Sequence, residues 1–317
     1  MELRHVRYFL AVAEERNFTN AAARLAIAQS PLSQQIRKLE REIGVELFTR
    51  TTRSVALTHA GQVFYDRMKS LLSDTEEAID AARKADQGML GKLTVGFTGS
   101  ATYELLPTLV RAYVDRYPEV TLEVRSDLVT PAQVSGLLQG TLAVGILRPP
   151  VQASGIAVET IRNEPVVVLL SGRHPAAVQR DIDLRALRDE GFVAYPDNPP
   201  SAMHTVMRTA CETAGFVPRI RHVAPDSATL VALVAAGLGI ALVPASLRHL
   251  GIKGATFRPL RSPKLTVPLA LAYREPNVDP LVRRFLETAR SVVRSRQTAE
   301  AVPAEPATDD DRFSLPL

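Results

Sequence analysis

A long run without proline constrains this chain most. From Thr58 to Gln87 no proline and no helix-breaking cluster occurs, and apolar or small side chains recur at alternating spacings of four and three. These seam positions are Phe64, Met68, Leu71, Thr75, Ala78 and Ala82. The pattern is heptad-like and predicts one helix about 40 Å long, ended by Gly88 and Gly91. Such a seam has no obvious place inside a compact domain, so we expect pairing with another subunit; packing on its own chain is the alternative.

The residues before this helix predict three shorter helices and two strands. Residues 2–15 have the apolar spacing of an amphipathic helix. Thr19 is a candidate N-cap for a second helix. A third is expected to begin at Ser30-Pro31, with Ser30 as cap and Pro31 in the first turn, and to end near Gly44. Residues 47–58 are typical of two short strands around a polar turn.

After Gly91 the pattern changes to alternating strands and helices. Strands are expected at 93–97, 120–124, 143–147, 166–170, 191–195, 239–243 and 267–273, and helices at 105–117, 131–139, 203–214, 226–236 and 279–295. Alternation of this kind predicts an open, mainly parallel α/β sheet, and the length suggests two lobes. The acidic, Pro- and Ala-rich residues 297–317 are expected to form a disordered tail.

Composition excludes some classes of protein. Residues 1–58 hold nine Lys/Arg and six Asp/Glu, a net of +3 out of +4 for the chain, so an anionic partner is expected at the N-terminal end. No apolar run is long enough for a membrane helix, and the first residues do not resemble a signal peptide. Cys211 is the single cysteine, which fits a reducing, cytoplasmic location.

No catalytic constellation is present in the sequence. The run from Gly237 to Leu242 begins like a dinucleotide fingerprint, but it lacks the third glycine and follows a helix. No GxSxG or HExxH motif occurs, and the histidines are scattered. We therefore expect no enzyme activity, no catalytic residues, no metal site and no cofactor.

The string FTNAAARLAIAQSPLSQQIRKLEREIGVELFTRTTRSVALTHAGQVF, residues 18–64, resembles the LysR-type transcriptional regulators. The resemblance extends from residue 1 to about residue 296. Within the family, GFTGSATYELLP, LVTPAQ and LVAAGLGIALVPASL are most similar to regulators of aromatic-compound catabolism, which respond to muconate, chloromuconate or benzoate.

The resemblance implies a multidomain α/β fold. It consists of a winged helix-turn-helix at 1–58, a dimerising linker helix at 59–88 and an effector domain at 91–296 like a type 2 periplasmic binding protein. Lobe I would comprise 91–160 and 267–296, and lobe II 161–266. The implied partners are double-stranded operator DNA with an inverted repeat, a small carboxylate inducer, RNA polymerase and further copies of the chain in a tetramer, a dimer of dimers.

The DNA contacts are expected at the start of the third helix, because the N-terminal residues of a recognition helix reach base edges in the major groove. Gln34 can donate to and accept from adenine, Ser33 can contact bases or phosphates, and Arg37 suits a phosphate. Arg53 at the wing tip suits the minor groove. The complete set is Gln29, Ser30, Pro31, Ser33, Gln34, Arg37 and Arg53. Each has a plain structural alternative as a solvated or capping residue.

Effector contacts are expected where strands run into helices, because a helix N-terminus binds anions. Ser100 and Thr130 match family positions that contact effector carboxylates, and Arg148 offers a further carboxylate partner. The expected set is Thr98, Gly99, Ser100, Thr130, Arg148, Ser201, Ala202 and Met203. Ser201-Ala202-Met203 stands where a Pro-Asn-Phe-like trio is expected, so ring stacking and an amide contact would be missing.

Two alternatives are a small-molecule receptor and an enzyme of periplasmic-binding-protein-like fold without a DNA role. The α/β region alone fits either of them. The N-terminal module argues against both.

Overall fold

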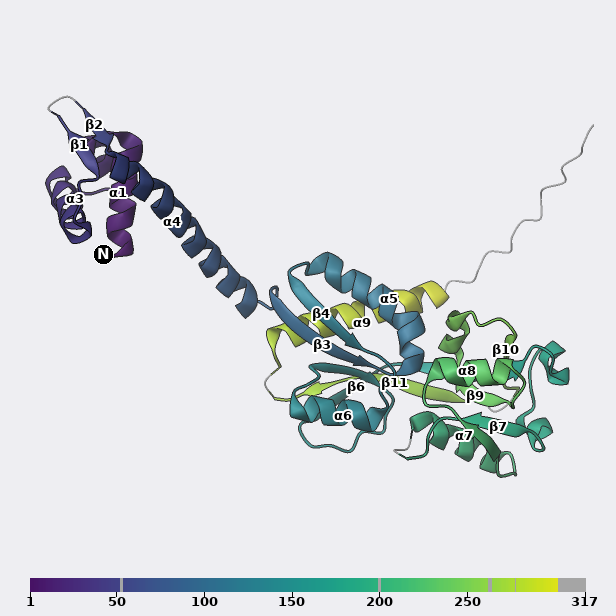
Figure 1. Cartoon of the computed structure of the whole chain (residues 1–317). Helices are drawn as coiled ribbons and strands as arrows, with labels where there is room; N and C mark the ends of the chain where they lie inside the picture. Colours follow the sequence, from purple (N-terminus) through teal and green to yellow (C-terminus); the bar gives the residue numbers. More distant parts are fainter. Residues whose placement is uncertain (52–53, 199–200, 262–263, 277, 302–317) are drawn as a thin grey trace, which may run out of the picture. The chain divides into compact units, whose positions relative to one another are not determined.

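The computed structural model describes the chain up to Ala301, except residues 52–53, 199–200, 262–263 and 277. The side chains of 297–301 also lie outside this description. The chain divides into two compact units, Met1–Lys84 and Ala85–Leu317. Figure 1 traces both units along the sequence.

The N-terminal unit combines helices with a two-stranded sheet. Its elements are α1 (Leu3–Glu15), α2 (Phe18–Arg24), α3 (Gln29–Ile43), β1 (Phe48–Arg50), β2 (Val55–Leu57) and nearly all of α4 (His59–Asp86). β1 and β2 pair antiparallel, so the hairpin predicted for 47–58 is confirmed. The long predicted helix is confirmed within one residue at each end. Gly88 follows it with a φ of 69°, a conformation that ends helices.

The cap predicted for α2 is wrong. The N-cap residue is Asn17, whose side chain accepts hydrogen bonds from the backbone N–H groups of Thr19 (2.8 Å) and Asn20 (3.1 Å). Thr19 is therefore already inside the helix. Asn and Thr can both cap, and the extended backbone at Asn17 decides between them.

The cap predicted for α3 is also wrong. The helix begins at Gln29, with Ala28 in the N-cap position and no side-chain cap. Ser30 and Pro31 therefore lie within the first turn, where proline is still tolerated because the first N–H groups have no helical partner. The predicted end is confirmed, since Gly44 adopts a φ of 83°.

A group of aromatic rings lies within the largely aliphatic core of the N-terminal unit. The ring of Phe9 lies 5.2 Å from that of Phe48 and 5.0 Å from that of Phe64 of α4. Along the predicted seam, Phe64 and Met68 pack on this core. Further along α4, Ala78 and its neighbour Ile79 are exposed, Ile79 by 47%. Packing on its own chain thus accounts only for the first turns of the seam.

The second unit contains strands interleaved with helices. The strands are β3 (Gly91–Phe97), β4 (Val120–Arg125), β5 (Val144–Leu147), β6 (Ile156–Ser171), β7 (Gly191–Ala194), β8 (Arg219–Val223), β9 (Ala241–Pro244), β10 (Ala255–Pro259) and β11 (Thr266–Arg274). The α-helices are α5 (Gly99–Arg116), α6 (Thr130–Gln139), α7 (Ala202–Thr213), α8 (Ser227–Ala235) and α9 (Pro280–Ala301). Short 3₁₀ helices are η1 (Pro175–Val178), η2 (Leu184–Leu187) and η3 (Ala245–Leu250).

The start predicted for α5 is wrong. The helix begins at Gly99 instead of Leu105 and includes Pro107. The segment Thr98–Ala101, expected to precede a helix, is therefore its N-cap and first turn. Ser100 and Ala101 are buried there, so packing rather than propensity places the start.

The prediction of a mainly parallel sheet is wrong. Among the described residues, the larger sheet has the order β10-β6-β11-β5-β3-β4, and β9 also pairs with β6. β3 pairs parallel with β4 and β5, and β7 pairs parallel with β8. β6 and β11, however, pair antiparallel with each other and with their other neighbours. The sheet is mixed because these two strands run between the lobes in opposite directions.

β6 and β11 connect the two lobes. Ile161 still packs on the core of lobe I, and Val166 belongs to the core of lobe II. The first crossing therefore lies a few residues after the predicted boundary at 160–161. Val267 lies in the core of lobe II and Leu269 in that of lobe I, so the second crossing lies between these two residues, just after the start predicted for the second segment of lobe I.

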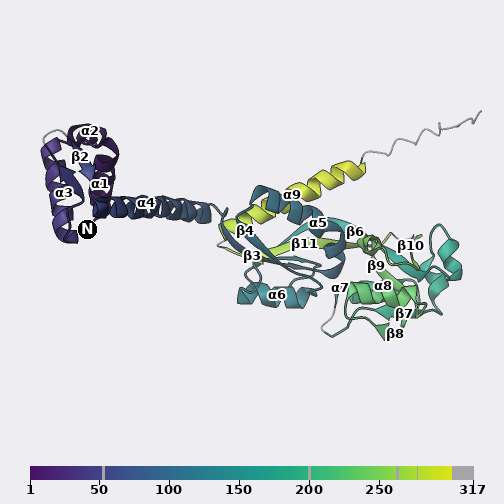
Figure 2. The same ribbon diagram turned by 45° about the horizontal axis from the view of Figure 1, so that its top comes forward.

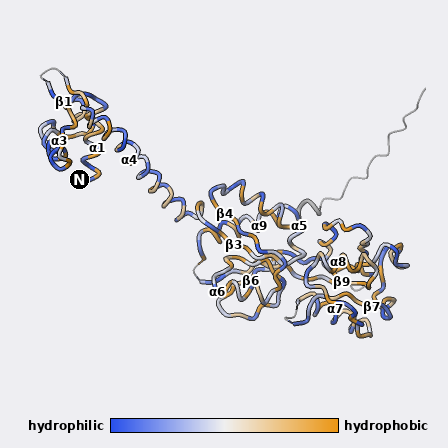
Figure 3. The backbone as a smooth tube through the Cα atoms, viewed as in Figure 1, coloured by the Kyte–Doolittle hydropathy of each residue, from blue (hydrophilic) through white to orange (hydrophobic). Residues whose placement is uncertain are grey.

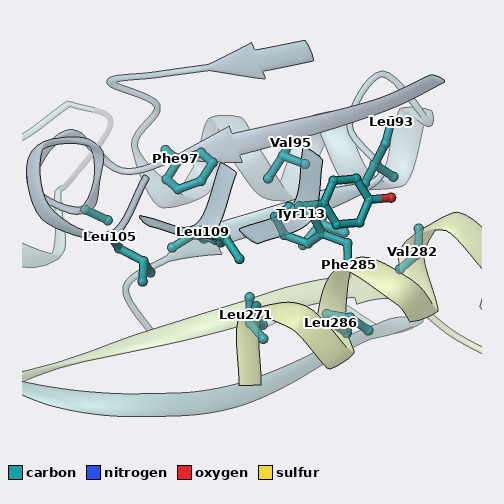
Figure 4. Close-up of a cluster of buried hydrophobic side chains, with 14 of the residues drawn as sticks. Leu93, Val95, Phe97, Leu105, Leu109, Tyr113, Leu271, Val282, Phe285 and Leu286 are labelled. Atoms are coloured by element: carbon teal, nitrogen blue, oxygen red, sulfur yellow. The ribbon is translucent and has the colours of Figure 1, made fainter. Parts of the chain in front are cut away.

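Helices cover both faces of the sheet in each lobe. In lobe I, α5 and α9 lie on one face and α6 on the other (Figures 1 and 2). Figure 4 shows the first of these layers, where the Tyr113 ring lies 5.2 Å from that of Phe285. In lobe II, alternate residues of β6 join the cluster containing α7 and the cluster containing α8. β9 between them is hydrophobic along its length (Figure 3).

The last helix is longer than predicted. α9 continues to Ala301, so the first residues of the segment predicted as a tail, 297–301, are helical. Their sequence contains no proline, so nothing in it interrupts the helical hydrogen bonds. Residues 302–317 lie outside the described part of the chain. Among the described residues, no helix is both long and apolar enough to cross a membrane.

Candidate DNA-binding surface and ligand cleft

α3 presents a polar face at its N-terminal end. Its buried face consists of Leu32, Ile36 and Leu39, each fully buried in the N-terminal core. The opposite face is built from the residues predicted to contact DNA. Gln29, Ser30, Pro31, Gln34 and Arg37 are exposed, and Ser33 is half-buried. The predicted wing residue Arg53 lies outside the described residues.

Glu40 joins α3 to the hairpin. Its carboxylate accepts hydrogen bonds from the backbone N–H groups of Leu47 (3.0 Å) and Phe48 (3.2 Å) and from Arg50 (2.6 Å). The Arg50 guanidinium also lies 5.1 Å from the centre of the Phe18 ring. These contacts, which sequence reasoning missed, hold the strands in a defined orientation on the helix.

Gly61 allows α4 to approach the same region closely. A Cβ atom at this position would overlap the carbonyl oxygen of Leu47 and lie 2.9 Å from its carbonyl carbon. The Thr58 hydroxyl also donates to the Glu46 carbonyl (2.8 Å) and accepts from the Gly61 N–H (2.8 Å). The end of β2 and the start of α4 are thus held against the segment that precedes β1.

The second unit contains a cleft between its lobes, and all eight residues predicted to bind an effector line it. They are Thr98, Gly99, Ser100 and Thr130 with Arg148 from lobe I, and Ser201, Ala202 and Met203 from lobe II. The cavity measures about 40 Å³. Small-molecule sites usually measure at least about 300 Å³, so the cavity in this structure is smaller than a usual ligand site.

The N-termini of four helices meet at this cavity. Thr98 and Val129 are the N-cap residues of α5 and α6, and neither provides a side-chain cap. Ser201 and Asp226 are the N-caps of α7 and α8, and both accept hydrogen bonds through their side chains. All four N-cap residues line the cavity. A helix N-terminus has about half a positive charge, so the convergence of these N-termini favours an anion.

Arg148 is buried at the base of the cleft and is only 3% exposed. Its guanidinium donates to the Ser100 hydroxyl (2.7 Å) and forms an ion pair with Glu164 (2.6 Å), which is also buried. Glu164 accepts a further hydrogen bond from the Ser246 N–H (2.7 Å). The Arg148 Nε atom has no hydrogen-bond partner among the described residues. Arg148 therefore brings a donor to the cavity, but its charge is balanced by Glu164.

The two hydroxyls singled out by the sequence have different roles. The Ser100 oxygen accepts from Arg148, so its proton is available to a ligand. The Thr130 hydroxyl donates to the Arg148 carbonyl (2.8 Å). Its proton is therefore used within the protein, and the backbone N–H of Thr130 is the better donor at this position.

Sequence reasoning missed two carboxylates in the cleft. Asp127 lies before α6 and Asp226 caps α8, and both line the cavity with Ser227. The Asp127 carboxylate accepts from the Ser227 N–H, while removal from water and the nearby charge of Asp226 raise its pKa. Burial raises the pKa of Tyr195 to about 12, and its hydroxyl lies 3.0 Å from that of Ser227.

No local motif could have revealed this acidic pair. Asp127 and Asp226 lie in different loops, about a hundred residues apart in the sequence. A left-handed φ of 56° at Asp127 is the one unusual local feature. Asp tolerates that conformation better than most residues do.

A larger hollow of about 620 Å³ lies along α5, β6, η3 and α9. Arg162 donates to both carboxylate oxygens of Glu104 (2.8 and 2.7 Å), and Arg296 donates to one of them (3.2 Å). None of the residues predicted to bind an effector lines this hollow.

The separate geometries of the two units agree with the families that their sequences match. Residues 3–62 match "Bacterial regulatory helix-turn-helix protein, lysR family", and residues 86–294 match "LysR substrate binding domain". The chain belongs to the LysR family. It is a DNA-binding transcriptional regulator with an effector-binding domain, and not an enzyme.

Similar proteins cover nearly the whole chain. The regulator AlsR of Bacillus subtilis is 39% identical over 286 residues, 90% of this chain and 94% of AlsR. BenM of Acinetobacter baylyi is 33% identical over 92% of this chain and 96% of BenM. Full-length CbnR bound to its target DNA has a TM-score of 0.81 at 30% identity, covering 92% of this chain and all of that one.

Proposed function

We propose that this regulator binds an inverted-repeat operator as a dimer of dimers and that a small carboxylate in the interlobe cleft controls its activity. The carboxylate belongs to the aromatic-derived class, as in regulators that respond to benzoate or muconate, and the activated protein acts on RNA polymerase in the cytoplasm. The main support is the convergence of four helix N-termini, two of them without side-chain caps, on a cavity that also holds Ser100 and Arg148.

The DNA-binding proposal rests on the exposed N-terminal face of α3. Gln34 would contact base edges, and Arg37 and the wing residue Arg53 would contact the backbone or minor groove. Loss of a phosphate contact lowers both affinity and its dependence on salt. The exposed C-terminal part of α4, including Ile79, supports pairing of two chains over a two-fold site.

A gel-shift titration against the upstream region of the regulator's own gene tests this proposal. Arg53→Ala is expected to weaken binding and reduce the salt slope by about one. Arg7→Ala removes an exposed arginine from α1, outside the proposed surface, and serves as the matched control. Unchanged affinity and slope for Arg53→Ala would contradict the proposed role of the wing.

The effector proposal is tested by replacing Ser100. Ser100→Ala removes a hydroxyl donor from the cleft, so a thermal-shift titration with benzoate is expected to show a loss of response while DNA binding is retained. Ser135→Ala, an exposed position on α6 outside the cavity, is the control. A benzoate titration that is the same for Ser100→Ala and the wild type would reject the assignment of Ser100.

A further inference from the structure

The charges in the interlobe cleft are distributed unequally between the lobes. On the lobe I side, α5 and α6 begin without side-chain caps. Each N-terminus offers backbone N–H donors and a partial positive charge. Thr98 and Val129 at the two N-cap positions contribute no carboxylate. The Asp127 carboxylate lies against Gly99 at the start of α5, so it is the N-terminus of α6 that retains a positive potential for a ligand carboxylate.

The lobe II side is already occupied by carboxylates. Asp226 caps α8, accepting hydrogen bonds from the Thr229 N–H (2.8 Å) and the Thr229 hydroxyl (2.8 Å). Asp127 extends from lobe I and accepts from the Ser227 N–H, at the first residue of the same helix. Two carboxylates thus face one helix N-terminus and overcompensate its partial positive charge.

Gly99 allows the lobe I and lobe II sides of the cleft to approach each other closely. A Cβ atom at this position would overlap the Asp127 carboxylate and lie 2.6 Å from the Ser227 hydroxyl oxygen. The start of α5, the Asp127 carboxylate and the start of α8 are therefore in close contact.

The only arginine that lines the described cavity does not offset the negative charge of Asp127 and Asp226. Arg148 is paired with Glu164 at 2.6 Å, and both side chains are at least 96% buried. Burial and the charges of Asp127 and Asp226 also raise the pKa of Tyr103, a residue of α5 close to the cleft. The lobe II side therefore has no unbalanced cation for a second ligand carboxylate.

We infer that the effector is a monocarboxylate, with its carboxylate toward the N-terminus of α6, and that Asp127 and Asp226 exclude dicarboxylates. The inference rests on the proposed carboxylate-binding function. It favours a benzoate-like effector over a muconate-like one. A second carboxylate within several ångströms of two fixed charges would lose affinity by roughly tenfold for each of them.

Isothermal titration of the full-length protein with matched acids tests the inference. Sorbate and trans,trans-muconate share a six-carbon diene and differ only by a methyl group in place of the second carboxylate. Butyrate and succinate form a shorter pair that differs in the same way. The wild type is expected to bind the monocarboxylate of at least one pair at least ~10-fold more tightly than its dicarboxylate.

In the double variant Asp127→Asn with Asp226→Asn, the ratio of the affinity for the monocarboxylate to that for the matched dicarboxylate is expected to fall by at least ~10-fold. Asn tolerates the left-handed conformation at 127 and remains a good N-cap at 226, so both changes suit the fold. Asp115→Asn on the exposed face of α5 removes a carboxylate outside the cavity and should leave the ratio unchanged.

The possible outcomes distinguish a failure of the monocarboxylate inference from a failure of the proposed carboxylate-binding function. Dicarboxylates that bind the wild type as tightly as their monocarboxylate partners would overturn the inference and leave the carboxylate function standing. An unchanged ratio in the folded double variant would overturn the role of Asp127 and Asp226. Failure of all four acids and of benzoate to bind would overturn the proposed function as well.

Discussion

Replacing Glu164 by glutamine is expected to destabilise the effector-binding unit by about 3 kcal/mol, because it leaves the buried Arg148 charge uncompensated. The two side chains are 3% and 4% exposed and lie 2.6 Å apart. The glutamine oxygen can still accept from the Ser246 N–H, which now donates to Glu164 at 2.7 Å. The substitution therefore removes the Glu164 charge and keeps this hydrogen bond; Arg162, 3.9 Å from the Glu164 carboxylate, retains its closer ion pair with Glu104. For a unit of this size the loss corresponds to a fall in melting temperature of about 6–12 °C.

Differential scanning calorimetry of the full chain measures this change. Asp115→Asn breaks the exposed pair with Arg111, whose side chains are 65% and 83% exposed, and should cost no more than about 0.5 kcal/mol. Replacing both partners, with Arg148→Met and Glu164→Leu, is expected to recover most of the stability because no buried charge remains. A Glu164→Gln transition within 1–2 °C of the wild type (roughly 0.5 kcal/mol) would refute the argument.

Three further predictions follow from particular contacts. Gly61→Ala is expected to lower the melting temperature of the DNA-binding unit because the new Cβ would overlap the Leu47 carbonyl. The same change stabilises an ordinary helix interior, so an increase in melting temperature would contradict the close approach of the two segments. Asp127→Asn should gain stability relative to the wild type as pH rises from about 4 to 7. Because the pKa of Asp127 is raised in the folded protein, the wild type loses the stabilising protonated form of this residue over that range. A difference in melting temperature between the variant and the wild type that does not change with pH would contradict this prediction. Glu40→Gln should weaken operator binding in gel shifts by loosening the hairpin through Arg50, whereas equal affinity would show that the hairpin is held without this ion pair.

The sequence pattern predicted the regular elements best where one periodicity continued over many residues. The helix α4 and the strands β3 and β5 lie within two residues of their expected positions. Predictions that depended on single residues were less accurate. Thr19 and Ser30 were reasonable caps, but the backbone places the N-caps at Asn17 and Ala28. β8 was missed because its side chains are largely exposed and do not alternate in hydrophobicity.

By itself, the sequence determined the division into a DNA-binding module, a long helix and a two-lobed α/β unit, and it identified eight residues that line one cleft. The helices and strands follow from local periodicity, whereas the DNA-binding module and the cleft residues follow from the resemblance of short segments to the LysR family. Only the tertiary structure decided that the sheet is mixed, that Arg148 is paired with Glu164, and that Asp127 and Asp226 lie together at the start of α8. Such contacts join side chains from distant segments, and no local pattern encodes which charges meet when the chain folds.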